Sequence, residues 1–127
     1  MAARAFDLVK SLCKGAVIIA GSFRPNGAGA VNNTLNQGTK GWSVARTGAG
    51  QYTITLDDGY PSVVAVVAMP QLNAAADGFM QARGAIDVTT AKTIVLENCV
   101  AAVPTDIASN ANNWVHFVAV LKNSQVS

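Results

Sequence analysis

The chain has 127 residues, of which half are hydrophobic and 13% are charged. A chain of this length and composition is one folded domain with a single core, which excludes a disordered protein and a second domain. The formal net charge is only +2 and the nine basic residues are spread along the sequence, which argues against a nucleic-acid partner.

Residues 1–14 are expected to form an N-terminal arm or a short helix that precedes the folded domain. Phe6, Val9 and Leu12 recur at three-residue spacing, which places them on one face of an amphipathic helix. Gly15 follows at the position where a helix C-cap is common. Such a segment would pack either on the sheet of its own chain or on a neighbouring subunit.

From residue 16 onward the pattern becomes that of β-strands. Ala16–Phe23 is rich in β-branched residues, which predicts a strand that is buried on both faces. Arg24–Gly41 is rich in Gly and Asn and has no periodicity, so it is interpreted as a long loop that either binds a partner or is an inert part of the surface. Trp42–Arg46 and Gln51–Leu56 alternate between apolar and polar residues, which predicts two antiparallel strands joined by a glycine-rich turn.

Four later segments have the composition of strands and are separated by turn or loop residues: Ser62–Pro70, Phe79–Val88, Lys92–Val100 and Trp114–Asn123. Pro70 is expected to end the first of them, Gly84 to form a bulge in the second, and the last to be buried on both faces. A second long polar loop is expected over Pro104–Asn113. About seven or eight strands without a strong helix predict an all-β fold, an antiparallel β-sandwich or jelly-roll-like barrel, which forms one domain over residues 15–127.

The sequence offers no arrangement of residues that predicts catalysis or a cofactor. His116 is the only histidine and lies in an apolar strand, where we expect it to be packed and hydrogen-bonded rather than a base or a metal ligand. Asp57 and Asp58 precede Gly59 in a turn and lack the spacing of a calcium-binding loop. The glycines of the segments NGAGA and GAGQ are not followed by the Lys and Ser or Thr of a phosphate-binding loop. The expected function is therefore not enzymatic, and no cofactor or metal is expected.

Neither the two cysteines nor the apolar segments indicate export or a membrane partner. Cys13 and Cys99 have no metal or redox spacing, and we expect reduced thiols, with a single disulfide as the alternative. The apolar run over residues 16–20 is too short to span a bilayer, and Asp7 and Lys10 interrupt the segment where a signal peptide would lie. We therefore expect the protein to be made and folded in a cytosol.

The low fraction of charged residues bears on how the surface is used. Much of the surface must consist of Ala, Gly, Thr, Ser and Asn, or be covered by neighbours. A weakly charged surface is typical of an oligomer or of a component of a lattice. A small, well-packed monomer has the same composition, so this pattern leaves both interpretations open.

Three segments, taken in their order along the chain, resemble a known family: GSFRPNGAGAVNN, KGWSVARTGAGQYTITL and TDIASNANNWVHFVAVLKNS. They are similar to the small β-rich capsid decoration, or cement, proteins that are encoded among the head genes of tailed bacteriophages and prophages. The similarity runs from about Gly21 to Ser124. The segment VARTGAGQYTITL alone is less specific, because similar strands occur in the trimeric jelly-roll heads of tail-fibre proteins.

The resemblance implies a jelly-roll-like structural protein of the virion that has no catalytic residues. Members of this family sit as trimers at three-fold positions on the capsid exterior and clamp neighbouring major capsid subunits. The implied partners are therefore the major capsid protein and further copies of the chain, in a virion assembled in the host cytoplasm. The candidate contact residues lie in the arm and in the Gly/Asn-rich loop: Phe6, Val9, Leu12, Arg24, Pro25, Asn26, Asn32, Asn33 and Lys40. The alternative function is that of a receptor- or glycan-binding head module of a phage tail fibre.

Overall fold

The computed structural model of the protein describes residues 15–74 and 78–122. The strands in chain order are β1 (Ala16–Phe23), β2 (Gln37–Gly38), β3 (Trp42–Gly48), β4 (Gln51–Leu56), β5 (Val63–Gln71), β6 (Gly78–Ala82), β7 (Thr93–Val100), β8 (Val103–Pro104) and β9 (Trp114–Lys122). A single 3-10 turn, η1 (Asn33–Leu35), lies between β1 and β2. The segment expected to be an N-terminal arm or helix, residues 1–14, lies outside the described residues.

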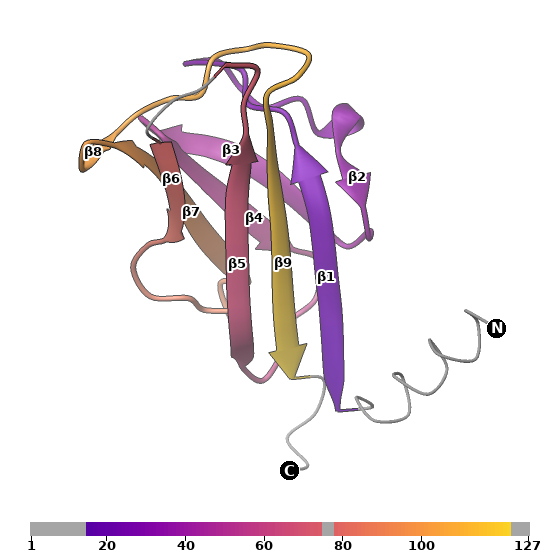
Figure 1. Cartoon of the computed structure of the whole chain (residues 1–127). Coiled ribbons are helices and arrows are strands. Elements are labelled where there is room, and N and C mark those ends of the chain that lie inside the picture. Colours follow the sequence, from indigo (N-terminus) through magenta and orange to yellow (C-terminus); the bar gives the residue numbers. More distant parts are fainter. Residues whose placement is uncertain (1–14, 75–77, 123–127) are drawn as a thin grey trace, which may run out of the picture.

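The strands form two antiparallel sheets that pack face to face as a β-sandwich (Figure 1). The first sheet, which we call sheet A, has the strand order β2-β1-β9-β5. The second, sheet B, has the order β3-β4-β7-β6, and the short β8 pairs with β7. The predicted all-β sandwich is therefore confirmed. No helix in the part of the chain that the structure describes is long and apolar enough to cross a membrane.

The core lies between the two sheets and consists mainly of alternate residues from the longer strands, together with Val31, Val88 and Ile107 from loops. Its aromatic centre is formed by Phe23 and Tyr52, whose ring centroids are 5.4 Å apart, and by Trp42, which meets the Phe117 ring edge-on at 4.8 Å. Trp42 can reach this position because the opposite strand has Gly21, where a Cβ atom would lie 2.3 Å from the indole ring. The longer strands thus contribute alternate side chains to one continuous apolar layer, whereas the short β2 and β8 are exposed.

Strands β1 and β9 are buried on one face only, so the prediction that both faces are buried is wrong for the isolated chain. In β1, Ile19 is 3% exposed and its neighbour Ile18 is 55% exposed. In β9, Phe117 is buried, whereas Val118 points outward and is exposed. An apolar composition predicts that both faces of a strand are buried. It does not say whether the second face is covered by the same chain or by another protein.

Three element boundaries also differ from the prediction. Strand β5 continues through Pro70 to Gln71, which an edge strand tolerates because the missing N–H need not pair with a second neighbour. Strand β6 ends at Ala82, because Gly84 adopts a φ of +72° and turns the chain away rather than forming a bulge. The long loop over residues 24–41 contains η1 and β2, which covers one end of β1.

Candidate interaction surfaces

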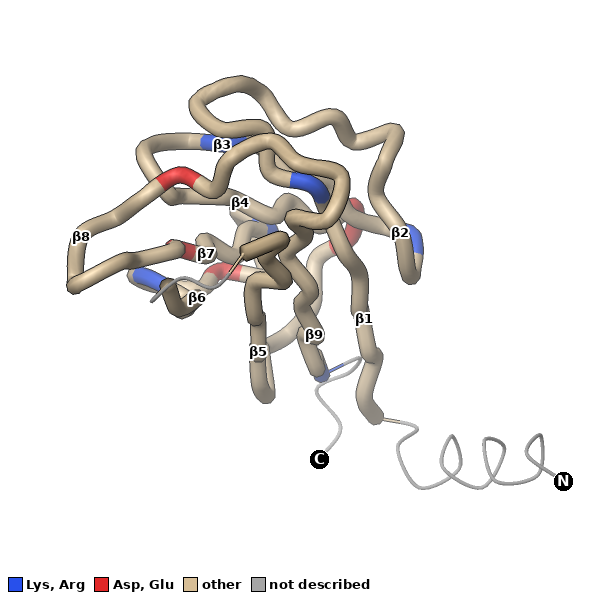
Figure 2. Tube along the Cα trace, turned by 45° about the horizontal axis from the view of Figure 1, so that its top comes forward, with Lys and Arg blue, Asp and Glu red and all other residues tan. Residues whose placement is uncertain are grey.

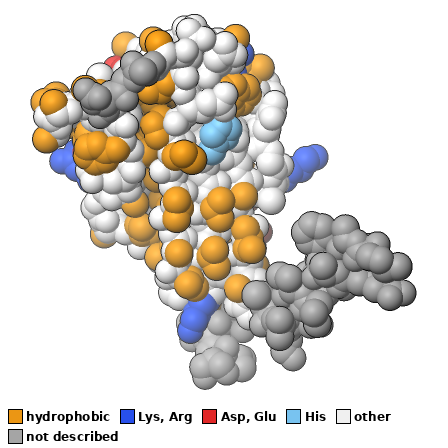
Figure 3. Space-filling view, viewed as in Figure 1, with side chains coloured by type: hydrophobic (Ala, Val, Ile, Leu, Met, Phe, Trp, Pro, Cys, Tyr) orange, Lys and Arg blue, Asp and Glu red, His pale blue; other side chains and the backbone are white. Residues whose placement is uncertain are grey.

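The outer side of sheet A is apolar across three adjacent strands. Its outward side chains form what we call the apolar face: Ile18 and Ala20 on β1, Val118 and Val120 on β9, and Ala65, Val67 and Met69 on β5. Figure 3 shows these hydrophobic side chains side by side over the sheet. The only charged residue in the three strands is Lys122, at the end of β9 (Figure 2). Contiguous apolar surface of this kind marks an interaction site in soluble proteins.

The strand register makes the apolar face continuous. Val118 is paired with Ala20 on one side and with Val67 on the other. Val120 is paired in the same way with Ile18 and Ala65. Cross-strand partners have Cβ atoms about 4.5–5.5 Å apart, so each row forms an unbroken apolar strip. The sequence did not predict this surface, although the continuous apolar runs of all three strands were the signal for it.

His116 closes the upper end of the apolar face with a hydrogen-bonded network. Its Nε2 lies 2.7 Å from Gln71 Oε1, and its Nδ1 lies 2.6 Å from Ser22 Oγ. Because Gln71 Oε1 can only accept, Nε2 donates to it and Nδ1 accepts from the Ser22 hydroxyl. The expectation of a hydrogen-bonded histidine is confirmed, but the ring lies half-buried on the outer side of sheet A rather than packed in the interior. The Ser22–His116 pair resembles a catalytic nucleophile and its base. However, the backbone N–H groups around Ser22 lie in the plane of the sheet, so none of them could stabilise an oxyanion formed above the Ser22 hydroxyl.

The second surface, which we call the loop end, is formed where two polar loops meet at one end of the sandwich (Figure 1). The loop after β1 and the loop before β9 are joined by a hydrogen bond from Gly27 N to Ile107 O at 2.9 Å. The Arg24 guanidinium lies 5.7 Å from the centroid of the Trp114 ring, within the range of a cation–π contact. A shallow hollow of about 200 Å³ lies between the loops, and Asn26, Asn32 and Ser109 are among the residues that line it.

The structure brings together only some of the predicted contact residues. Arg24, Asn26 and Asn32 share the hollow at the loop end. Lys40 lies apart, on a second hollow beside Trp42.

Two other predicted contact residues have structural roles. Pro25 is fully buried, so the prediction that its side chain contacts a partner is corrected. Both amide atoms of Asn33 bond to the backbone of Val44, with Val44 N donating to Oδ1 at 2.8 Å and Nδ2 donating to Val44 O at 3.0 Å. Asn33 therefore fixes the loop to β3. Phe6, Val9 and Leu12 lie outside the described residues.

An ion pair that sequence reasoning did not find fixes the loop end to sheet B. Arg46 Nε and Nη2 donate to the Asp106 carboxylate at 2.9 and 2.8 Å, and Gly50 N donates to the same carboxylate at 2.8 Å. The hydrogen bonds from Arg46 and then from Gly50 hold the pKa of Asp106 below its usual value. The two charged residues are sixty positions apart, so no local pattern in the sequence could have paired them.

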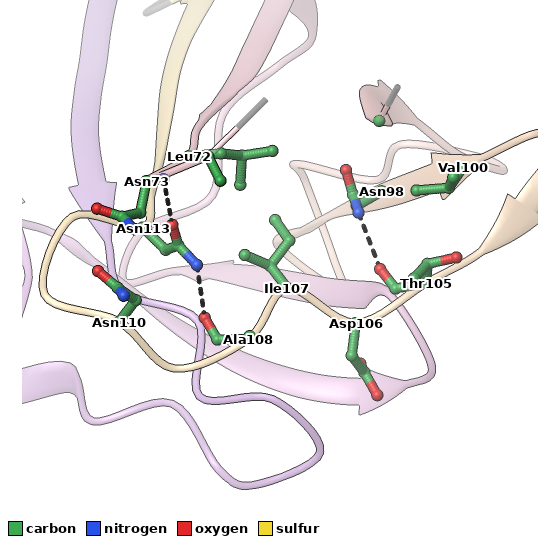
Figure 4. Close-up of a pocket in the computed structure, with 12 residues that line it drawn as sticks. Leu72, Asn73, Asn98, Val100, Thr105, Asp106, Ile107, Ala108, Asn110 and Asn113 are labelled. Carbon is green, nitrogen blue, oxygen red and sulfur yellow. Dashed lines mark hydrogen bonds between the residues drawn. The ribbon is translucent and has the colours of Figure 1, made fainter. Parts of the chain in front are cut away.

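A larger hollow of about 350 Å³ opens beside the loop end, between the two sheets (Figure 4). Leu72 and Ile107 contribute apolar walls, and the side chains of Asn73, Asn98, Asn110 and Asn113 also line it. Asn98 is 4% exposed; its Nδ2 donates to Thr105 O at 2.9 Å, and its Oδ1 has no partner among the described residues. Asn98 Oδ1 is therefore a buried hydrogen-bond acceptor beside the hollow that no described group satisfies.

Cys99 and Glu97 lie on the outer side of sheet B, where they are buried under longer side chains. Cys99 Sγ donates to Glu97 Oε1 at 3.5 Å, and burial raises the pKa of this thiol, which makes it a poor nucleophile. Cys13 lies outside the described residues, so the pairing of the two cysteines stays a prediction.

Among the described residues, the apolar face, the loop end and the larger hollow beside it are thus the surfaces that could bind a partner or a ligand. Over residues 15–74 and 78–122, no group of three or more His, Cys, Asp or Glu side chains is placed to hold a metal ion. Comparison of the chain with models of known protein families, with curated proteins and with solved structures gives no match.

Proposed function

We propose that this protein is a structural component of a virion that decorates and stabilises a bacteriophage capsid by binding the lattice of the major capsid protein, as a trimer. The structural observation that supports the proposal is the apolar face, because a small sandwich that exposes three adjacent aliphatic strands gains from being covered by protein, here by the other copies in the trimer. The resemblance of three sequence segments to capsid decoration proteins supports the same function and supplies the identity of the partner.

In this proposal the loop end contacts the capsid. Its exposed residues are mostly Asn, Gly and Ala, which suit a polar interface that forms only when the shell is present. The loop before β9 is held in place by the Arg46–Asp106 ion pair, so little conformational entropy is lost when it binds. Each contact can be weak, because many copies bound to one lattice add up to strong stabilisation of the shell.

The proposed function is tested by the abundance of the chain in particles. Virions of a phage that encodes it are purified, and their proteins are quantified by mass spectrometry in whole particles and in isolated tails. A decoration protein is expected at a copy number comparable with that of the major capsid protein, and in heads rather than tails. Absence from virions, or confinement to tails, would overturn the proposal.

A pair of matched variants tests the role of the loop end. Ala28→Glu places a charge on the exposed loop after β1, and Ala45→Glu places the same charge on the outer side of sheet B. Binding to purified shells is measured by co-sedimentation. Ala28→Glu is expected to weaken binding at least about tenfold, which corresponds to about 1.4 kcal/mol, while Ala45→Glu binds like the parent chain. Equal effects of the two variants would exclude the loop end as the contact.

The second candidate function is that of a receptor- or glycan-binding head module of a tail fibre. The observation that favours it is the hollow of about 350 Å³, because its four asparagine side chains offer the amide groups that bind sugar hydroxyls. This function predicts few copies per particle, all at the tail, so the same mass-spectrometric measurement separates it from capsid decoration.

A further inference from the structure

We propose that the apolar face is the contact between copies of this chain, and that the capsid binds elsewhere on the molecule. This inference rests on the proposed function and assigns one partner to one surface. Val67 on β5, Val118 on β9 and Ile18 on β1 are its most exposed aliphatic residues across the three strands. The occupants of the face are the other copies of this chain in the proposed trimer, which present their own apolar faces.

The charge distribution favours a second copy as the occupant. When two copies meet through the same surface, identical side chains approach each other, and identical charges there would repel. The three strands of the face contain one charged residue, Lys122, which lies at the end of β9 rather than at the centre of the face. The face can therefore meet its own copy without bringing like charges together at its centre.

The composition of the face indicates a permanent contact. Interfaces that form and dissociate are about as polar as the rest of a protein surface, whereas the contacts of homo-oligomers are more apolar. The central rows of this face contain only Ile, Val and Ala. A decoration protein must stay in solution before it meets the shell, so an apolar face has to be covered beforehand. Another copy of the same chain is the partner that is present from the start of synthesis.

The dimensions of the face also fit a copy of the same sheet. Three strands span about 14 Å across, and the nine residues of β9 span about 30 Å. Two aliphatic sheet faces pack about 10 Å apart in β-sandwiches, which is how sheets A and B already pack within one chain. In the trimer proposed above, the apolar faces of three copies would turn toward the common axis, so that each face packs against the faces of the two other copies.

The test compares two exposed valines, one on the face and one away from it. Val67 is 66% exposed on β5, and Val103 is 60% exposed on β8 of the other sheet. The full chain and the variants Val67→Asp and Val103→Asp are studied by analytical ultracentrifugation over a wide concentration range. The parent chain and Val103→Asp are expected to be oligomers, whereas Val67→Asp dissociates with an association at least about tenfold weaker.

Two results would overturn this inference: a parent chain that is monomeric at every concentration, or two variants that associate equally well. Circular dichroism establishes that each variant is folded. If Val67→Asp does not fold, Met69→Gln on the same face is the milder replacement and is expected to weaken association in the same direction. Because self-association is measured without capsids, a monomer that is abundant on heads overturns this inference and the trimer, but not the decoration of the capsid. An oligomer that is absent from virions overturns only the proposed function.

Discussion

The outer sides of the two sheets differ in what they present to the surroundings. On sheet A, the outward side chains of β1, β9 and β5 are aliphatic and make no polar contact until His116. On sheet B, the outward side chains of β3, β4 and β7 are mostly threonines, glutamine and glutamate that bond to one another. Thr47 Oγ1 and Thr53 Oγ1 lie 2.9 Å apart, and Gln51 Nε2 donates to Glu97 Oε2 at 3.0 Å.

This difference separates a side of the protein whose polar side chains are hydrogen-bonded to one another from a side whose aliphatic side chains are exposed in the isolated chain. The network on sheet B also includes Arg83, which pairs with the buried Glu97. A sheet face satisfied in this way gains little from being covered by another protein. An aliphatic face on the same small domain gains about 25 cal/mol for each Å² removed from water, and this gain is available only through association. The two faces therefore suggest that the outer side of sheet A contacts other copies of the chain and that the outer side of sheet B stays in contact with solvent.

The largest expected effect on the free energy of unfolding is a difference between substitutions on the inner and on the outer side of sheet A. Ile18 and Ile19 are adjacent residues of the same type on β1, and they point to opposite faces. Ile19→Ala should lower the free energy of unfolding by about 2–5 kcal/mol, because it opens a cavity in the core. Ile18→Ala should change it by less than about 0.5 kcal/mol in the dissociated chain. Urea denaturation at low protein concentration measures both values.

Equal destabilisation by the two alanines would contradict this description of sheet A. It would mean that the outer face of β1 is covered within the chain itself, and the contrast between the two sheets would disappear. As a control, ultracentrifugation of Ile18→Ala should show weakened self-association, which a purely structural role of Ile18 would not produce.

The next effect concerns pH and belongs to sheet B and its attached loop. Hydrogen bonds from Gln51 and then from Arg83 lower the pKa of Glu97, and Arg46 followed by Gly50 lowers the pKa of Asp106. A carboxyl whose folded-state pKa is depressed stabilises the fold at pH values above its unfolded pKa of about 4. That contribution is lost as the pH falls through 4 toward the lower folded-state pKa. The free energy of unfolding should therefore decrease between about pH 5 and pH 3.

Two aspartate variants show whether the effect comes from the ion pair. Asp106→Asn should make the unfolding free energy less dependent on pH, because the depressed carboxyl is gone. Asp58→Asn is the matched control, since this exposed carboxylate makes no hydrogen bond or ion pair within the described residues. Urea midpoints measured at several pH values give the slopes, and an unchanged slope in Asp106→Asn would contradict the prediction. Self-association through the apolar face should persist over this range for as long as the chain is folded.

The hairpin of β3 and β4 shows how much of the fold could be predicted from the sequence. Regular alternation places Val44, Ile54 and Leu56 on the core side, and Gly50 adopts the positive φ that the turn requires. These signals depend only on neighbouring residues, so they can be recognised in the sequence. The pairing of Arg46 with Asp106 depends on the packing of a distant loop and left no local signal.

The exposed apolar face was not predicted from the sequence. The apolar runs of β1 and β9 predicted burial on both faces, whereas one face of each strand is exposed in the isolated chain. A single sequence does not distinguish a strand that is covered within its own chain from one that another chain could cover. For the same reason the predicted contact set contained Pro25, which is buried, and none of the outward aliphatic residues such as Val67. Residues that act between chains have the composition of a core and are predicted as core.

The smallest expected effect on stability comes from replacing one outward aliphatic residue of sheet A by threonine, a residue that is common on the outer side of sheet B. Val67→Thr keeps a β-branched side chain on β5 and adds the hydroxyl that is common on the outer side of sheet B. The free energy of unfolding of the dissociated chain should stay within about 0.5 kcal/mol of the parent value, since Val67 faces outward. Self-association should weaken nevertheless, because the contact would bury a hydroxyl that has no partner there. Ultracentrifugation and urea denaturation of the same sample measure the two quantities, and a loss of folding stability without a loss of association would reverse the roles given to the two sheets.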